Sequence, residues 1–520
     1  MNRPAILVWL LGLIICLSSL SACPPDDDDD DDDNDAADDD AADDDATDDD
    51  TSDDDTTDDD TGDDDTGDDD TFDPNEPNDE IGVFVDNRGS DDNPGTMASP
   101  KRTVQAGADL ALTTGKVVFV AEGIYQGNSS VSVSLYGGYQ KGTWQRDVLL
   151  YQSKLWDEHN TPLLVVGDKD DALIVVDGFI IDGGMVENDS CGVRILDANV
   201  RLSGNSITAQ SISGQRSGYT IGVSIIHSQV EMRDNIVVSG SIQCATYCVA
   251  DADSVAVNSF DSTLKMTHNQ LLTKPHSLDA FCASGYALRA EGGAAHLAYN
   301  QFYATANPVY TLSVTYGASL TDCDEVVLIA NRFHAFRSIG AYALSMKKSF
   351  TYPAMKVTAI NNLFHGGGTT EYGGLVEATG GIELTLLNNV IELHERSTEA
   401  TGVDASSLYG QSPRLTVRNN TFDLPWGTML LQSDYTQCFN ATQVNGCAWA
   451  GCDEAGDNLA GHAGLQGIYD GHLVADSMCI DAGINPSPWY GGAEIYVDMD
   501  GQARPHGDAW DIGMDEYYSK

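Results

Sequence analysis

The amino-acid sequence predicts an all-β solenoid, in which short parallel strands form coils that stack on one another. One pattern of apolar residues around an asparagine recurs eight times along the 520 residues, and the eight asparagines are spaced 30, 34, 31, 31, 31, 27 and 31 residues apart. A period near 31 is typical of a stacked array rather than an ordinary globule. The residues five and three positions before each asparagine, and two after it, are always apolar. This alternation favours strands. A leucine-rich or helical repeat is the alternative, but no 3.6-residue period supports it.

The recurring asparagine interrupts the alternation, because its flanking apolar positions are an odd number of residues apart. We therefore predict that the asparagine turns the chain at a corner, since Asn tolerates the left-handed backbone conformation better than other non-glycine residues. Coils would stack about 4.8 Å apart, and neighbouring side chains would bond amide to amide. The predicted structural ladder consists of Asn205, Asn235, Asn269, Asn300, Asn331, Asn362, Asn389 and Asn420.

Motifs before the first asparagine indicate how the stack begins. A Gly-Ser-Asp-x-Asn-Pro-Gly-Thr loop spans residues 89–96, a Pro-x-x-Thr-x-Gln helix start contains Thr103, and residues 118–125 are typical of a strand. With the coils and the C-terminal stretch, these motifs resemble an uncharacterised bacterial family of pectin-lyase-like proteins, over roughly residues 83–518. The resemblance implies a right-handed parallel β-helix, with a short helix that Thr103 caps and that covers the first coil. It implies little about activity, because β-helices serve many functions.

The N-terminus carries the features of an export signal. Arg3 precedes an apolar core that is too short to span a bilayer. The run Leu-Ser-Ala-Cys that ends at Cys23 resembles a bacterial lipobox, which implies cleavage before Cys23 and attachment of lipid to it. An ordinary secretory signal is the alternative. We expect a lipid-anchored protein of the bacterial cell envelope, at the outer membrane or cell surface, whose lipid makes the membrane a partner.

Blocks of Asp, mostly of three, follow Cys23. The 30 Asp between Asp26 and Asp70 supply about half of the net charge of −56, and the rest of the chain is acidic in its own right. The Asp-rich tract has little to bury and repels itself, so we predict a disordered, extended stalk; a diffuse Ca²⁺-binding tract is the alternative. The acidity excludes a nucleic-acid partner. The expected organisation is a lipoprotein signal peptide (1–22), an Asp-rich stalk (23–72), an N-terminal cap with the first coils (73–150), β-helix repeats (151–430), and C-terminal coils with a Cys-containing cap (431–520).

Nine cysteines remain after Cys16 and Cys23, which leaves at least one free thiol if the others pair. Disulfides are compatible with export. Four of the nine lie where the last coil needs a cover, so we predict two bridges of unknown pairing among Cys438, Cys447, Cys452 and Cys479. Zinc is the alternative ligand, although paired Cys-x-x-Cys motifs are absent from the sequence.

The only candidate catalytic residues are those that share the same distance from a ladder asparagine. Asp197, His227 and Asp261 each lie eight residues before a ladder asparagine, and Glu291 lies next to the corresponding position of the following coil. Coils in register would stack these groups into a column that could bind a cation or perform acid–base chemistry. The alternative is that they are turn residues, among which Asp is common.

The sequence favours a non-catalytic surface protein with an adhesive, binding or envelope-structural role, with polysaccharides or envelope components as partners. A stalk suits display, and a regular stack offers long lateral faces to extended ligands. The alternative is a Ca²⁺-dependent polysaccharide lyase or a glycoside hydrolase on the same fold, and this leaves open whether the chain is an enzyme. We predict no cofactor; Ca²⁺ binding stays open, and no metal site can be assigned from the sequence.

Overall fold

The computed structural model describes residues 72–159, 161–168, 172–186, 189–213, 218–243, 252–274, 283–305, 314–336, 340–349, 353–367, 373–393, 400–406, 408–409, 411, 413–423, 428–432, 445–448, 464–466 and 470–518. The residues from Asp73 onward belong to one compact unit. The predicted signal peptide, the lipid-anchor candidate Cys23 and the Asp-rich stalk lie outside the described residues, and so do Cys438 and Cys452. Among the described residues, no helix has the length and apolarity needed to cross a bilayer.

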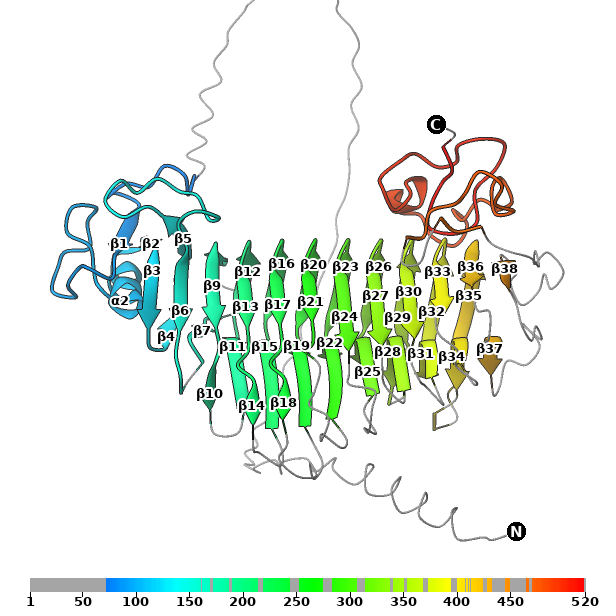
Figure 1. Ribbon diagram of the computed structural model, residues 1–520, viewed down its shortest axis with the longest axis horizontal. Helices are drawn as coiled ribbons and strands as arrows, with labels where there is room; N and C mark the ends of the chain where they lie inside the picture. Colours follow the sequence, from blue (N-terminus) through cyan, green and yellow to red (C-terminus); the bar gives the residue numbers. More distant parts are fainter. Residues whose placement is uncertain are drawn as a thin grey trace, which may run out of the picture. The chain divides into compact units, whose positions relative to one another are not determined.

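The described chain is a right-handed parallel β-helix, as the repeat and the resemblance predict (Figure 1). Each coil contributes one strand to each of three sheets, so that strands far apart in the sequence pair in parallel. The coil around Asn205 is representative, because β11 (Asp189–Leu196), β12 (Asn199–Ser203) and β13 (Ser206–Thr208) pair with β15, β16 and β17 of the next coil.

The first sheet runs through the whole stack. Its strands, in order, are β1 (Gly82–Val85), β2 (Val117–Ala121), β5 (Leu135–Tyr139), β8 (Ile174–Asp177), β12, β16 (Gln229–Arg233), β20 (Thr263–Thr267), β23 (Ala294–Ala298), β26 (Glu325–Ile329), β29 (Met355–Ile360), β32 (Ile382–Leu387) and β35 (Arg414–Arg418).

The second sheet follows the asparagine corner of each coil and ends on one antiparallel strand, β38. Its strands are β3 (Gly123–Gln126), β6 (Ser153–Trp156), β9 (Phe179–Asp182), β13, β17 (Ile236–Val238), β21 (Gln270–Leu272), β24 (Gln301–Thr305), β27 (Arg332–Phe336), β30 (Leu363–Gly367), β33 (Val390–Leu393), β36 (Asn420–Asp423) and β38 (Asn445–Ala448).

The third sheet completes each coil. Its strands are β4 (Ser129–Val131), β7 (Leu163–Val166), β11, β15 (Gly218–Ile226), β19 (Ala252–Phe260), β22 (Ala283–Glu291), β25 (Val314–Thr321), β28 (Gly340–Lys348), β31 (Gly373–Gly380), β34 (Ala400–Ser406) and β37 (Thr428–Gln432). The remaining elements are β10 (Gly184–Val186), antiparallel to β11, the pair β14 (Ile212–Ser213) and β18 (Ile242–Gln243), the helix α2 (Val104–Thr114) and the 3₁₀ helix η1 (Ala493–Tyr496).

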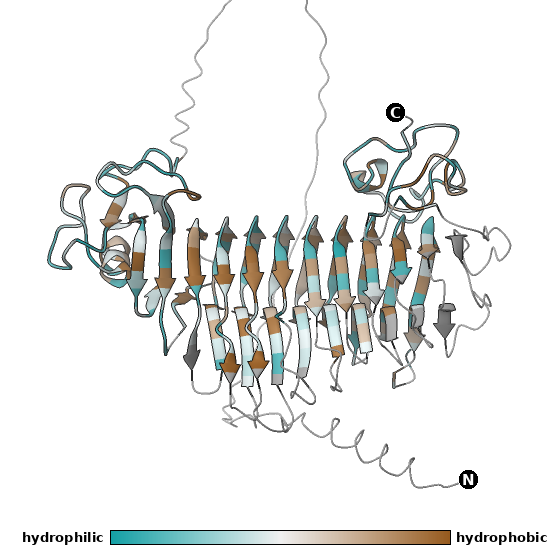
Figure 2. Cartoon of the chain, in the orientation of Figure 1, coloured by the Kyte–Doolittle hydropathy of each residue, from teal (hydrophilic) through white to brown (hydrophobic). Residues whose placement is uncertain are grey.

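Apolar side chains of all three sheets meet inside the coils and form one continuous core. Figure 2 shows the apolar bands across the strands that this alternation produces. Phe302, Phe333 and Phe364, each two residues after a ladder asparagine, stack with centroids 4.7 and 5.3 Å apart. Burying a side chain of this size contributes about 1.5–3 kcal/mol relative to leaving it exposed, so the apolar positions predicted from the repeat account for the stack.

The eight asparagines form the predicted ladder inside the stack. Each is at most 2 % exposed. From Asn205 to Asn389, the backbone N–H and the side-chain Nδ2 of each asparagine donate to Oδ1 of the next, at 2.8–3.1 Å. Each Nδ2 also donates to a carbonyl of the preceding coil, for example Asn300 to Met266 O at 2.9 Å. The ladder therefore satisfies polar groups that the core would otherwise leave unpaired.

The prediction that the asparagines themselves take the left-handed conformation is wrong. A positive φ belongs to the residue immediately before each one. The physical reason is that each asparagine aims its N–H and its amide along the stack at the next Oδ1, so the preceding residue turns the chain. The residues with positive φ are Gly204, Asp234, His268, Tyr299, Ala330, Asn361, Asn388 and Asn419.

A helix follows the first strand of the stack, where the sequence places a helix start. The Oγ1 of Thr103 accepts a hydrogen bond from Ala106 N at 3.2 Å, which makes Thr103 the N-cap of α2. The helix contacts β1, β2 and β4, and it buries Val104, Ala108 and Ala111. That α2 shields the first coil from solvent stays a prediction.

The described part of the C-terminal segment lies along the asparagine corner of the last coils (Figure 1). Asn361 Nδ2 donates to Val497 O at 2.8 Å, and Asn361 Oδ1 accepts from Arg504 at 3.0 Å. Asn419 Nδ2 donates to Ile484 O at 2.6 Å. The segment therefore docks on several coils from the side, in addition to any cover over the last coil.

The cysteines divide between the core and the C-terminal region. Cys191 and Cys323 are buried free thiols, which confirms that the protein has at least one. Cys479 is fully buried, with Sγ 3.9 Å from Thr421 Oγ1. Thr421 is paired in register with Cys447 of β38. Which cysteines pair stays a prediction.

Candidate functional site

The outer face of the third sheet carries a continuous row of polar side chains. Val193 and Ile195 of β11 are fully buried, and Arg194 lies between them. Strand register places one residue of each following coil in line with Arg194, because the coils stack without slippage at this position. This row, here called the lateral column, consists of Arg194, Ser224, Asn258, Arg289, Ser319, Ser345, Glu377 and Asp404. Its charge changes from basic to acidic along the stack.

A hollow of about 310 Å³ lies beside the basic part of the lateral column. Phe260 is 45 % exposed and lines it. Arg289 Nη1 lies 3.4 Å from Asp253 Oδ2, and the guanidinium lies 5.7 Å from the centre of the Tyr286 ring. Asn258 and Glu291 add an amide and a carboxylate to the wall. An exposed ring beside hydrogen-bonding groups can bind a ligand that has both apolar and polar faces.

Three tyrosines stack beside the lateral column. The rings of Tyr286, Tyr316 and Tyr342 are nearly parallel, with centroids 4.7 and 5.3 Å apart. Burial, followed by the charges of Glu377 and Asp404, raises the pKa of Tyr342 to about 12. The stack stays neutral at physiological pH and gives the face a rigid aromatic support.

The acidic end of the column holds two carboxyl groups in register. Glu377 of β31 pairs with Asp404 of β34. Ser345 Oγ donates to Glu377 Oε2 at 2.6 Å. Burial raises the pKa of Glu377 despite this hydrogen bond, and the charge of Asp404 raises it further; burial likewise raises the pKa of Asp404. Paired carboxyls with raised pKa values are candidate acid–base groups, and sequence reasoning missed them because no shared spacing from the ladder singled them out.

The residues that the sequence nominated for chemistry lie at the corner where the third sheet meets the first. Asp197, His227 and Asp261 all have positive φ, of 47°, 48° and 43°. Asp197 Oδ1 lies 3.6 Å from His227 Nδ1, and both side chains are about half exposed or more, at 67 % and 49 %. The backbone supports the alternative that these are turn residues, because a left-handed position favours Asp.

Glu291 does not belong to that corner column. It pairs with Phe260 and Thr321, whereas Gly292, with a φ of 71°, follows in the corner position. Glu291 instead lines the hollow beside Arg289. The structure thus brings Asp197 and His227 together at an exposed turn and places Glu291 in the neighbouring hollow.

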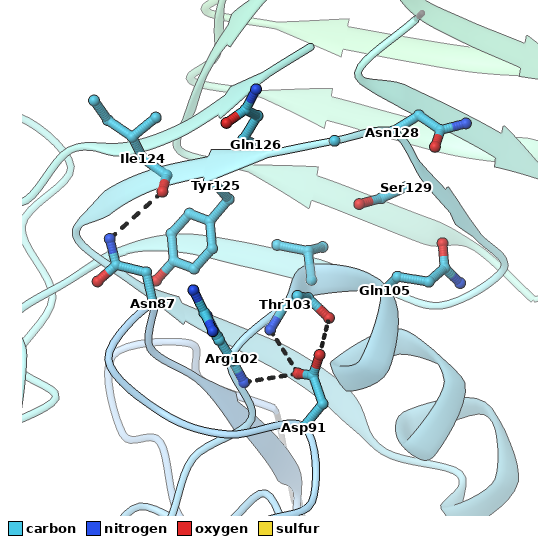
Figure 3. A pocket seen from close by; sticks show the side chains of 12 residues that line it. Asn87, Asp91, Arg102, Thr103, Gln105, Ile124, Tyr125, Gln126, Asn128 and Ser129 are labelled. Carbon is cyan, nitrogen blue, oxygen red and sulfur yellow. Dashed lines mark hydrogen bonds between the residues drawn. The ribbon is translucent and has the colours of Figure 1, made fainter.

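A larger cavity of about 630 Å³ lies near the N-terminus of α2 (Figure 3). Its carboxylate, Asp91, accepts hydrogen bonds from Arg102 N, Thr103 N and Thr103 Oγ1 at 2.9–3.1 Å. Burial raises the pKa of Asp91, but these hydrogen bonds outweigh burial and lower it. Asn87 Nδ2 donates to Ile124 O at 3.4 Å. The carboxylate of this cavity therefore secures the start of the helix, which favours a structural role.

Comparisons with known proteins extend to fold-level likeness only. No family model matches the chain, and no curated protein matches it. Among solved structures, the pectate lyase Pel9A is similar at 11 % identity and a TM-score of 0.40, covering 86 % of this chain and 98 % of that one. The Streptococcus pneumoniae surface protein and adhesin PfbA is similar at 12 % identity and a TM-score of 0.33, and the match covers 63 % of this chain and 94 % of that one. A rhamnogalacturonan lyase is similar at 12 % identity and a TM-score of 0.28, and the match covers 68 % of this chain and 84 % of that one. Similarity this distant assigns no activity.

Proposed function

We propose that this chain is a surface-displayed, lipid-anchored protein that binds glycans through the outer face of its third sheet. The observation that carries the proposal is the hollow in which exposed Phe260 lies beside Arg289, Asn258 and Glu291. A sugar ring offers an apolar face to an aromatic ring, and its hydroxyls suit amide and charged partners. Every member of the lateral column except the buried Ser224 and Ser345 is partly exposed, so the same face can contact successive units of a polymer.

The binding test uses the full chain and a panel of neutral and acidic polysaccharides. Phe260→Ala and Arg289→Ala should each weaken binding about tenfold, since about 1.4 kcal/mol corresponds to that factor. Ile236→Ala is the matched control, because Ile236 is similarly exposed, at 43 %, but belongs to the second sheet. Equal affinities for wild type and both third-sheet variants, or no binding to any polymer, would contradict the proposal.

The anchor is supported by the lipobox that ends at Cys23 after a short apolar core. Cys23→Ser should move the protein from the membrane fraction to the soluble fraction, because the modified thiol is lost. Partitioning of the variant at the wild-type level would show that another segment holds the protein. The Asp-rich stretch serves in this proposal as a spacer between the lipid and the coils.

One observation favours a second candidate function, the cleavage of a polysaccharide. Glu377 and Asp404 are neighbours in strand register, and burial raises the pKa of both carboxyl groups. Neighbouring strands lie about 4.8 Å apart, a spacing compatible with the roughly 5 Å between the two carboxyls of retaining glycosidases. Incubation with polysaccharides, with and without Ca²⁺, should yield no new reducing ends and no unsaturated sugars if the protein only binds. Activity that Glu377→Gln and Asp404→Asn abolish would assign catalysis to this pair; activity lost instead in Asp197→Ala, His227→Ala or Asp261→Ala would assign it to the corner.

A further inference from the structure

The C-terminal segment gathers one imidazole and several carboxylates at a point away from the third sheet. His472, Asp500 and Asp515 each offer a ligand atom, and these three atoms lie within 4.8 Å of one another. The residues come from three separate stretches of the segment, so the arrangement is a product of tertiary folding and not of one acidic stretch of sequence.

The imidazole is oriented by a further carboxylate. Asp470 Oδ1 bonds to His472 Nδ1, and Nε2 faces Asp500 Oδ2 at 2.6 Å. A carboxylate on one ring nitrogen that directs the other nitrogen at a cation is the arrangement by which proteins fix a metal-binding histidine.

Asp515 supplies an independent observation. Its side chain is only 5 % exposed, and among the described residues its hydrogen bond is the one that Leu473 N donates to Oδ2, at 2.7 Å. The other oxygen accepts no hydrogen bond from those residues. That oxygen is available to a cation, and a largely buried carboxylate beside a second carboxylate is stabilised when a cation joins the group.

We propose that His472, Asp500 and Asp515 bind a divalent transition-metal ion, with Asp470 as the positioning residue behind the histidine. One nitrogen and two carboxylate oxygens are a ligand set that suits Zn²⁺ or Mn²⁺ better than Ca²⁺, which takes oxygen ligands. The ion would tie three separate stretches of the segment together beside the corner that Asn361 and Arg504 fasten to the coils.

The test compares metal binding by the full chain with that of variants, after removal of metal with a chelator. Titration with Zn²⁺ should show one tight equivalent in the wild type. His472→Ala and Asp500→Asn should each weaken that equivalent at least tenfold, and Asp515→Asn should do the same. Weak binding to the Asp-rich stretch is common to all variants and cancels in the comparison. His296→Ala is the matched control, because His296 is exposed on β23 of the first sheet.

Two further measurements keep the outcome decisive. Asp500 is 41 % exposed, and Asp500→Asn keeps the shape of the side chain. Its metal-free unfolding midpoint, measured beside that of the wild type, separates lost ligation from misfolding. Zn²⁺ or Mn²⁺ should raise the unfolding midpoint of the wild type and of His296→Ala, but not of Asp500→Asn. An equally tight equivalent in wild type and His472→Ala, a tight response to Ca²⁺ alone, or no tight equivalent in the wild type would each overturn the proposal.

Discussion

Two corners of the repeating coils, one at each end of the first-sheet strand, solve the same backbone problem in different surroundings. At the corner between the first and second sheets, a left-handed residue precedes a buried ladder asparagine. At the corner between the third and first sheets, a left-handed residue such as Asp197 or His227 precedes a small buried residue. Both turns need a positive φ, but only the first continues into an unbroken chain of side-chain amides.

The second corner holds a shorter, weaker ladder of hydroxyls. Ala198 N donates to Ser228 Oγ at 3.1 Å, and Ser228 N donates to Ser262 Oγ at 2.9 Å. Each hydroxyl in turn donates to a carbonyl of its own coil, for example Ser228 to Ile226 O at 2.7 Å. The ladder stops at Gly293, which has no side chain to continue it. A hydroxyl has one donor, whereas an amide has two, so the asparagine corner can bond forward and backward at once.

A polar column is therefore not evidence of chemistry by itself. Asp197, His227 and Asp261 are periodic because the backbone repeats a left-handed turn, and their side chains extend into solvent. Stability should therefore depend strongly on the asparagine corner, moderately on the serine ladder, and little on the exposed turn residues.

Asn300→Leu should have the largest effect. Asn300 Oδ1 accepts from both the N–H and the Nδ2 of Asn269, and its own Nδ2 bonds to Met266 O and Asn331 Oδ1. Leaving several of these groups buried and unpaired should reduce the free energy of unfolding by at least about 3 kcal/mol. Urea unfolding measures it, with the exposed Asn128→Leu as control; equal midpoints for the two variants would contradict the role of the ladder.

Ser228→Ala should have an intermediate effect. The change removes the acceptor of Ala198 N and a donor to Ile226 O, so we expect a loss of about 1–2 kcal/mol. Ser130→Ala is the control, because Ser130 is exposed on β4. A loss as large as that of Asn300→Leu would show that the two corners contribute equally.

Ala330→Gly should stabilise the protein slightly. Ala330 has a φ of 50°, which costs a residue with a Cβ about 1–2 kcal/mol, and the greater freedom of glycine in the unfolded chain offsets part of that gain. We expect a net increase of up to about 1 kcal/mol in the free energy of unfolding. Ala298, the last residue of β23, pairs with Thr267 and Ile329, and the same change there should instead destabilise by about 0.5–1 kcal/mol. Destabilisation at both positions would argue against strain at the corner.

His227→Asn and Asp197→Asn should have the smallest effects on stability. Asn is compatible with a positive φ, and the exposed pair that these residues form contributes little. We expect changes within about 0.5 kcal/mol in urea unfolding. A loss above about 1.5 kcal/mol in either variant would mean that the exposed column stabilises the stack.

The sequence of the last three repeats contains a signal for the place where the C-terminal segment docks on the coils. In the last three repeats the left-handed residue is itself an asparagine, which makes the doublets at 361–362, 388–389 and 419–420. The second asparagine of each doublet belongs to the ladder. The first is buried beneath the C-terminal segment, and Asn361 and Asn419 bond to its backbone. In the earlier repeats the left-handed residue is of another type. The asparagine doublet therefore marks the repeats in which the left-handed residue is buried.

The sequence by itself determined the period, the apolar positions and the asparagine ladder. A solenoid repeats one local environment, so the same residue types recur at a regular spacing along the chain. It also placed Thr103 at the start of the N-terminal helix. Tertiary structure alone decided which corner residue takes the positive φ, that Glu291 leaves the corner column for the hollow beside Arg289, that Glu377 meets Asp404, and that His472 meets Asp500 and Asp515. These groupings join residues that share no common spacing in the chain, and only the stacking of coils and the docking of the C-terminal segment set their distances.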